Sequence, residues 1–420
     1  MSNFEAAKKL FFDGLDLLGA YHYSAAEAKF LGSLSFVPDR ASTLANLSSA
    51  QLKLKKYDEA KASAERALSL NGGLAEAWLN LGLIQHELGN YRNALVFFDK
   101  ATEVQPDYYD GYWNKSLAQL VEGDYENGWE NYEYRWKITN AEPAFQSAIP
   151  RLQHIDSVSG KSVLAWHEQG FGDTIQFARY IPLLIQRGAK VTFMVPASLR
   201  SLFAGQFDCV VVSGDVQRDD FDFQIPLLSL PLLFKTDANS IPAEVPYLNI
   251  PDQKVLNWKR KLSASENRLN IGISCSGSQS FDLQHGNNRP IPLAMFAPLI
   301  DMANLFLIQK EIRDEDSVFL AQNPAINMTG DAIEDFEDSG AIVECMDMII
   351  SVDTSLAHLA GALGKKVYVL LQHSPDWRWL LDRDSSPWYP TATLIRQPNR
   401  GDWQAVMTQV LKEVSGFRAG

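Results

Sequence analysis

The chain has few of the features that mark secreted, membrane-spanning or nucleic-acid-binding proteins. Its three cysteines (Cys209, Cys275 and Cys345) are far apart and form no CxxC pair, which argues against a disulfide framework. No run approaches the roughly 20 apolar residues of a membrane span, and the first residues do not resemble a signal peptide. The formal net charge is −13, whereas sequence-independent nucleic-acid binding needs a basic surplus. We therefore expect a cytoplasmic protein that binds neither nucleic acid nor membranes.

The first third of the sequence repeats with a period of 34 residues. Units start at Ala7, Ala41, Ala75 and Tyr109. The fourth position of a unit is large, and the eighth is small (Leu10, Leu44, Trp78, Tyr112; Gly14, Ser48, Gly82, Ser116). This pattern is typical of tetratricopeptide repeats, in which each unit is a helix–turn–helix and the units stack into a superhelix. It predicts a four-repeat array over residues 1–145.

One polar position recurs inside these repeats. The sixth residue of the last three units is asparagine (Asn46, Asn80 and Asn114), whereas the first unit has Phe12 there. An amide side chain both donates and accepts hydrogen bonds, so a row of such amides could hold an extended acceptor peptide along the groove. Asparagine at this position could equally serve packing between neighbouring units. The residues alone leave both interpretations open.

From residue 158 the pattern changes to short apolar strands that alternate with helices. We expect a first α/β half over residues 158–252, with strands at 162–166, 191–195, 209–213 and 221–227 and a helix at 175–187. A second half over residues 268–415 would hold strands at 269–274, 305–309, 348–352 and 366–371. The fold class is therefore α + α/β, a repeat superhelix followed by two facing Rossmann-type halves. The gap between two such halves is the expected ligand site.

The ends of these strands carry the candidate site residues. Gly170-Phe171-Gly172-Asp173 follows the first strand of the first half, and Ser274–Ser278 takes the equivalent place in the second. The strand at 348–352 ends in Asp353-Thr354-Ser355 and a helix begins at once, so free backbone N–H groups face an anion such as a diphosphate. From spacing alone, Asp173 is best interpreted as an N-cap that stabilises its helix by about 1 kcal/mol. His358, one turn into its helix, is best interpreted as a core histidine.

Four stretches of the second part are similar to a known group of bacterial proteins. These stretches are 168–180 (Glu-Gln-Gly-Phe-Gly-Asp-Thr-Ile and onward), 289–293 (Arg-Pro-Ile-Pro-Leu), 353–360 and 375–390. They resemble proteins that carry tetratricopeptide repeats ahead of a GT-B glycosyltransferase domain related to the heptosyltransferases of glycosyltransferase family 9. In architecture the chain also resembles the O-linked N-acetylglucosamine transferases, whose repeats present a protein substrate.

The resemblance implies a role for each matching residue. Asp173 corresponds to the general base, which would take the proton of an acceptor hydroxyl during an inverting transfer. The donor would be a nucleotide-diphosphate sugar, with no metal or other cofactor. The implied donor-binding residues are Gly170, Gly172, Ser276, Gly277, Arg289, Lys310, Asp353, Thr354, Ser355 and His358. The acidic strings Asp220-Phe221-Asp222 and Asp314-Glu315-Asp316 are interpreted as solvated patches rather than metal ligands.

The chain also departs from that group. Relatives show several basic residues ahead of the Ile-Pro-Leu, where this chain has Asp282, His285, Asn287 and Asn288 and keeps only Arg289. Ser355 stands where heptosyltransferases have glycine. Two hypotheses follow: a glycosyltransferase that modifies a protein or peptide bound in the repeat groove, or a non-catalytic interaction scaffold with a degenerate GT-B domain. A lipopolysaccharide heptosyltransferase fits less well, and self-association into a homo-oligomer is left open.

Overall fold

The computed structural model describes residues 2–138, 148–214, 216–217, 220–262, 267–278 and 289–419. For residues 418 and 419 the description covers the backbone alone. The chain divides into two compact units, Met1–Ala141 and Glu142–Gly420. Of the helices in these described ranges, none combines the length and the hydrophobicity that a membrane crossing requires.

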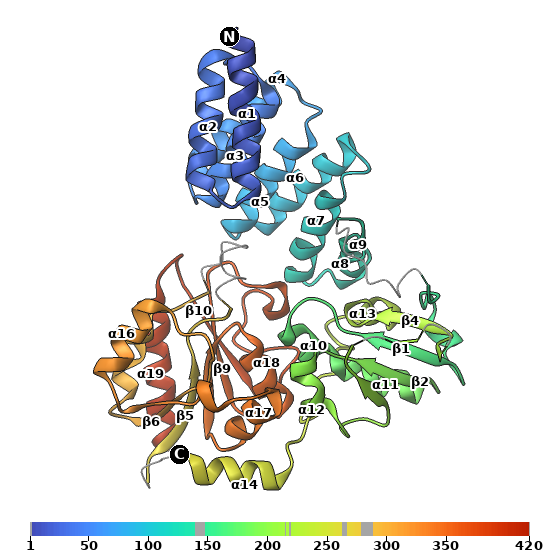
Figure 1. Ribbon diagram of the computed structural model, residues 1–420, viewed down its shortest axis with the longest axis vertical. Coiled ribbons are helices and arrows are strands. Elements are labelled where there is room, and N and C mark those ends of the chain that lie inside the picture. The colour runs from blue at the N-terminus through green and yellow to red at the C-terminus, as the bar shows by residue number, and fades with distance from the viewer. Residues whose placement is uncertain are drawn as a thin grey trace. The chain divides into compact units, whose positions relative to one another are not determined.

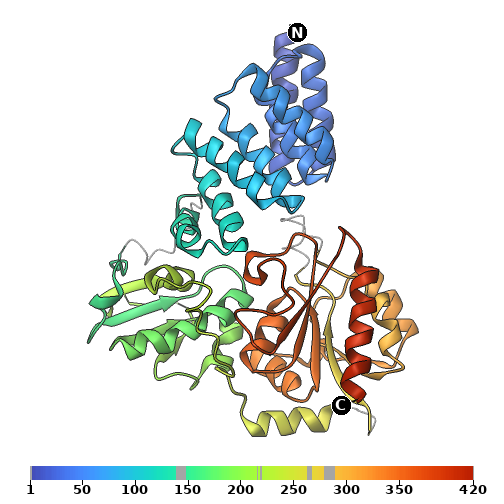
Figure 2. The same cartoon turned by 180° about the vertical axis from the view of Figure 1, so that it is seen from behind.

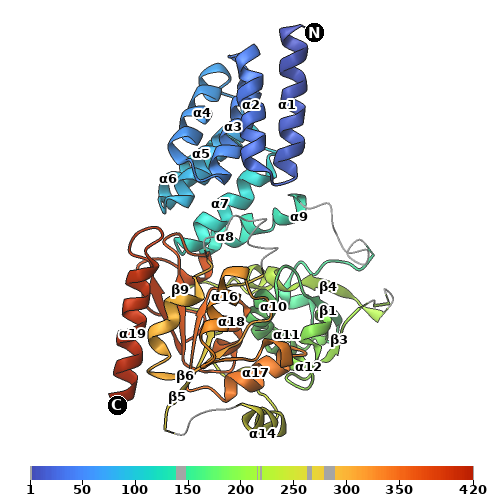
Figure 3. The ribbon, with the colours of Figure 1, turned by 60° about the vertical axis from the view of Figure 1, so that its left-hand side comes forward.

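The first unit is an array of antiparallel helix pairs (Figures 1 and 3). The four pairs are α1 (Asn3–Gly19) with α2 (Tyr23–Phe36), α3 (Ala41–Lys53) with α4 (Tyr57–Leu70), α5 (Ala75–Glu87) with α6 (Tyr91–Val104), and α7 (Tyr109–Val121) with α8 (Tyr125–Tyr132). A Cβ atom on Gly14 would lie 2.6 Å from the Phe30 ring. The small eighth position therefore lets the two helices of a repeat approach closely, as the repeat pattern predicts.

The second unit begins with a four-stranded parallel sheet of order β3-β2-β1-β4. Its strands are β1 (Ser162–Trp166), β2 (Lys190–Met194), β3 (Val210–Val212) and β4 (Phe223–Pro226). The helix expected at 175–187 is wrong in its bounds. It starts earlier, as α10 (Phe171–Phe177), and a 3-10 turn separates it from α11 (Ile181–Gln186). Two short helices, α12 (Arg200–Phe203) and α13 (Leu230–Leu233), follow β2 and β4.

A six-stranded parallel sheet of order β10-β9-β8-β5-β6-β7 follows. Its strands are β5 (Leu269–Ser274), β6 (Ala303–Leu307), β7 (Ile326–Met328), β8 (Met348–Val352), β9 (Val367–Leu371) and β10 (Ala392–Arg396). The helices of this part are α14 (Asp252–Lys261), α16 (Asp314–Gln322), α17 (Phe336–Glu344), α18 (Ser355–Ala362) and α19 (Trp403–Ala419). The strand pattern of the sequence predicts neither β7 nor β10, and the strand predicted at 305–309 begins two residues later than β6.

Side-chain alternation along the strands separates the two faces of the larger sheet. Ile271 and Ile350 belong to one buried cluster with Val406 and Val410 of α19. Helix α19 lies beside the strands of this sheet (Figure 2). Gly272 points the other way, because a Cβ atom there would meet the side chain of Ile349. In both sheets the strand order reverses at the first strand, β1 or β5. Ligands of open α/β sheets bind outside the carboxyl ends of the strands at such a reversal.

Candidate functional site

The loop after β1 presents Asp173 at the start of α10. Gly170 is the residue before the helix, and its N–H donates to Asp173 Oδ2 over 2.8 Å. Asp173 is the third residue of α10 and forms a capping box with Gly170, so the interpretation of Asp173 itself as the N-cap is wrong. Burial raises the pKa of the Asp173 carboxyl, although the neighbouring arginine guanidinium opposes that rise.

That guanidinium belongs to Arg378, which follows β9. Its Nη2 donates to Asp173 Oδ1, its Nε donates to Gln176 Oε1 over 2.8 Å, and its Nη1 donates to Asp376 Oδ1 over 2.8 Å. The side chain is only 8% exposed and lies 4.2 Å above the centre of the Trp377 ring. Arg378 thus joins the first α/β half to the second through a buried, charge-assisted network.

The turn between β8 and α18 lies in the same neighbourhood. Thr354 precedes α18, and its hydroxyl lies 3.0 Å from that of Ser351. The helix starts at Ser355, so its first N–H groups have no acceptor within the helix. Asp353 lies beside this helix start, where burial and the Asp376 carboxylate raise its pKa to about 6 while Arg289 opposes the rise.

His358 is a buried part of this turn. Its Nδ1 lies 3.0 Å from the Tyr389 hydroxyl, and its ring stacks on Trp379 with 5.4 Å between the ring centres. Nε2 is 3.9 Å from Asp353 Oδ1. Burial, followed by the charges of Arg378 and other arginines, lowers the pKa of His358 well below its ordinary value. The histidine is therefore a neutral, packed side chain at neutral pH.

Gly172 brings the two halves into direct contact. A Cβ atom there would lie 2.8 Å from His358 Cδ2 and 3.5 Å from the Ser355 Cα. Glycine is required at this point because the start of α10 packs closely on the first turn of α18. The loops of the two halves that sequence analysis singles out therefore meet in one place.

The remaining donor-binding candidates surround the ends of β5 and β6. Ser276 is buried and its Oγ accepts from Gln309 Nε2 over 3.1 Å. Gly277 lies against Thr354, whose Cγ2 would be 3.6 Å from an added Cβ. Arg289 Nη1 donates to the Asp353 carbonyl over 3.2 Å. Lys310 is an exposed residue of the loop after β6.

Some sequence candidates are not placed in this site. Asp282, His285, Asn287 and Asn288 lie outside the described residues. The interpretation of Asp316 as a solvated residue is wrong, because it is 2% exposed and accepts from Arg313 Nε over 2.7 Å. In the described ranges no group of three or more histidines, cysteines and carboxylates could hold a metal ion.

The three asparagines of the repeats differ in their contacts. Asn80 is buried, and its Nδ2 donates over 2.8 Å to the carbonyl of Ala45 in the preceding repeat. Asn46 and Asn114 are half-buried and donate to carbonyls one turn earlier in their own helices, those of Ser42 and Asp110. The contact of Asn80 matches the packing interpretation. Asn46 and Asn114 are still partly exposed, so for them the groove interpretation stays a prediction.

Three residues of this site, Gln176, Arg378 and Tyr389, have no role that the sequence pattern predicts. All three lie inside the stretches that carry the family resemblance, but neither spacing nor charge shows what they contact. The one available signal is a cation within an aromatic stretch, Trp377-Arg378-Trp379. Buried arginines commonly need both carboxylate and aromatic partners.

Comparisons with known proteins identify the repeats. Tetratricopeptide-repeat models match residues 41–73 and 75–108. Protein FlbA of Caulobacter vibrioides is 24% identical over 319 residues, which cover 70% of this chain and 52% of that protein. The chain thus spans about half the length of this curated relative.

Solved structures similar to this chain include two tetratricopeptide-repeat proteins. The TPR domain of Arabidopsis OM64 is 19% identical, with a TM-score of 0.27, over 28% of this chain and 98% of that one. A thermophilic TPR protein of Thermus thermophilus is 18% identical, with a TM-score of 0.31, over 32% and 76% of the two chains.

Proposed function

We propose that the chain is a glycosyltransferase that takes a nucleotide-diphosphate sugar, with the two α/β halves acting as a GT-B pair. One observation carries the proposal. The loops at the carboxyl ends of β1 and β8 meet, because Gly172 lies against His358 and Arg378 binds Asp173 from the other half. Both loops lie at strand ends where open α/β sheets bind ligands.

The reaction would use Asp173 as its general base. An acceptor hydroxyl transfers its proton to an Asp173 oxygen while its own oxygen bonds to the anomeric carbon of the sugar. The bond from that carbon to the diphosphate oxygen breaks, and the nucleoside diphosphate leaves with the bonding electrons, so the configuration inverts. An ionised carboxylate offers about four acceptor positions, which leaves room for a substrate hydroxyl beside Gly170 and Arg378.

The negative charge of the leaving diphosphate needs compensation. The first N–H groups of α18, from Ser355 and Leu356, supply fixed partial positive charge. Arg289, which already lies beside Asp353, and the exposed Lys310 add two cations. Ser276 and Gly277 line the adjacent strand end. Such preorganised donors do the work that a metal ion does in other transferases.

The acceptor would be a protein or peptide bound by the repeat array. Stacked repeats form extended concave surfaces that suit a peptide. The carbonyl oxygens of the Asn46 and Asn114 side chains can accept from such a peptide while their amide nitrogens keep their bonds within the helix. Asn80 is committed to Ala45 and would act by holding the repeats in register.

Release of nucleoside diphosphate by the purified full chain tests this proposal. A panel of UDP-, GDP- and ADP-linked sugars would be offered with and without peptide acceptors. Asp173→Asn should lower turnover by about 10²- to 10⁴-fold, the usual contribution of a general base. Asp156→Asn is the control, because that side chain lies ahead of β1 and is 92% exposed. Unchanged turnover in Asp173→Asn would exclude Asp173 as the base.

The same geometry supports a second candidate, the non-catalytic scaffold. The start of α18 is covered by Gly172, and Asp173 already binds Gly170 and Arg378, so the Asp173 carboxylate has hydrogen-bond partners without a ligand. Calorimetry with UDP, GDP, ADP and CMP distinguishes the two candidates. Absence of binding at millimolar concentrations favours the scaffold, and binding that Arg289→Ala weakens favours the transferase.

A further inference from the structure

A glutamine recurs at the eleventh position of three repeats. Gln51, Gln85 and Gln119 are 34 residues apart, and each lies in the first helix of its pair. A buried or half-buried amide needs hydrogen-bond partners, because an unsatisfied one costs about 1–3 kcal/mol. We therefore compare the hydrogen-bond partner that each of these three glutamines has in its own repeat.

Two of the glutamines are bound by a polar residue from the second helix of their own repeat. Gln51 Oε1 accepts from the Ser63 hydroxyl over 2.7 Å. Gln119 Oε1 accepts from Asn131 Nδ2 over 2.8 Å. Ser63 and Asn131 both occupy the twenty-third position of a repeat. In these repeats the hydrogen-bonded pair links the two helices of the unit.

The third repeat has Phe97 at that twenty-third position. Gln85 Oε1 accepts instead from Asn90 Nδ2 over 3.1 Å. Within the described residues, Gln85 Nε2 has no acceptor at hydrogen-bond distance. The phenyl ring stacks on Trp78 with 6.1 Å between the ring centres, so it cannot replace the missing polar partner.

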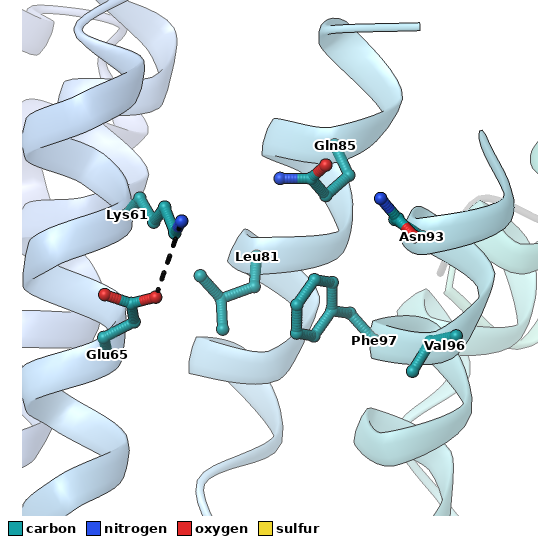
Figure 4. Close-up of a pocket in the computed structure, with 7 residues that line it drawn as sticks. All are labelled: Lys61, Glu65, Leu81, Gln85, Asn93, Val96 and Phe97. Carbon is teal, nitrogen blue, oxygen red and sulfur yellow. Dashed lines mark ion pairs between the residues drawn. The ribbon is translucent and has the colours of Figure 1, made fainter. Parts of the chain in front are cut away.

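A surface pocket of about 360 Å³ opens where the pair is missing. Its walls come from α4, α5 and α6, as Figure 4 shows. The residues that line it are Lys61, Glu65, Leu81, Gln85, Asn93, Val96 and Phe97. Leu81 and Phe97 form an apolar floor, and Val96 is an aliphatic wall that is 57% exposed.

We propose that this pocket binds an extended peptide segment of a partner protein through one aliphatic side chain. The side chain would lie against Leu81, Val96 and Phe97, and the adjoining peptide groups would bond to the amides of Gln85 and Asn93. An amide side chain offers the same donor and acceptor set as a peptide group, so the two are complementary.

The charges of the pocket favour this occupant over an ion. Lys61 and Glu65 lie 3.8 Å apart and offset each other, which leaves the pocket with no net charge to attract a phosphate or a metal. The volume is near the lower end of the roughly 300–1,000 Å³ of ligand sites. It suits one side chain with its flanking peptide groups rather than a folded surface.

This site is separate from the asparagine row of the proposed acceptor groove. Gln85 follows Asn80 by five residues on α5, which is a rotation of about 140° around a helix of 3.6 residues per turn. The inference therefore does not depend on the transferase activity. It holds or fails with the repeats alone.

Selection of random heptapeptides displayed on phage against the purified full chain tests the proposal. Enriched peptides should share one Leu, Ile or Val at a fixed position. Their affinity should fall at least tenfold with Val96→Asp, because a buried aliphatic group would then face an unpaired carboxylate. Phe97→Asn, which supplies Gln85 with the kind of partner that Asn131 is for Gln119, should remove the apolar floor of the pocket and abolish binding.

Leu31→Asp is the matched control, since Leu31 is an aliphatic residue of α2 that is 51% exposed. It should leave the affinity unchanged, and circular dichroism should show that Val96→Asp keeps the helices. Failure to enrich any peptide, or enriched peptides that bind Val96→Asp as well as the wild type, would overturn the proposal. So would a wild-type dimer in sedimentation that Val96→Asp dissociates, because a second copy would then be the occupant.

Discussion

Replacing Asp353 by asparagine should stabilise the protein at neutral pH and have little effect in acid. The carboxyl lies beside α18, where burial and Asp376 raise its pKa to about 6 from an ordinary value of 3.8. A carboxyl whose folded-state pKa is raised contributes stability below its unfolded pKa, and that contribution is lost as the pH rises through the folded value. Asparagine stays neutral throughout.

The magnitude follows from the two pKa values. A shift of one unit corresponds to 1.36 kcal/mol, so a rise to about 6 makes ionised Asp353 cost at most about 3 kcal/mol. The side chain is 13% exposed, so solvent screening reduces this cost only in part. The loss should develop between about pH 4 and pH 6 and be complete by pH 7.5.

Urea unfolding at several pH values, followed by tryptophan fluorescence, measures the effect. The free energy of unfolding of Asp353→Asn should exceed that of the wild type by up to about 3 kcal/mol at pH 7.5 and match it near pH 4. Asp156→Asn, at an exposed carboxylate, controls for the change in net charge. A difference that is independent of pH, or a wild type that gains on the variant above pH 6, would refute the reasoning.

Two further substitutions test the packing of the chain. Gly172→Ala should destabilise the second unit by about 1–3 kcal/mol, because the new methyl group would lie 2.8 Å from His358 Cδ2. Thermal unfolding measures this effect. A variant with the unfolding midpoint of the wild type would show that the two loops separate easily. Asn80→Ala should cost about 0.5–1.5 kcal/mol by removing the hydrogen bond that joins Asn80 to the Ala45 carbonyl of the preceding repeat. Asn46→Ala, which removes a bond within one helix, should cost less, and equal losses would argue against the packing role of Asn80.

The order of elements in the chain could be predicted well from its sequence. Repeat starts at Ala7, Ala41 and Ala75 agree with helices that begin within a few residues of these positions. Strands that are mostly apolar and buried, such as β1 and β8, were also predictable, because a short apolar run marks them in the sequence. The edge strand β7 has only three residues, and the other edge strand, β10, is interrupted by Thr393 and ends in Arg396, so neither stands out from loops.

The candidate site could be predicted only in part. Asp173, Asp353 and His358 follow strand ends, and parallel strands place their ends on one edge of a sheet. Local pattern could not show that Arg378 joins these loops. It lies 205 residues after Asp173, and a charge within an aromatic stretch is compatible with many surroundings.

The sequence by itself determined the repeats, because each unit of 34 residues packs mainly on its neighbours and its periodic large and small residues specify that packing. Tertiary structure decided which polar side chains of the repeats have a hydrogen-bond partner on the facing helix. Gln51, Gln85 and Gln119 look alike in the sequence, yet only contacts across helices show that Gln85 lacks the partner its counterparts have. Hydrogen-bond satisfaction is a property of three-dimensional neighbours, and no local pattern records it.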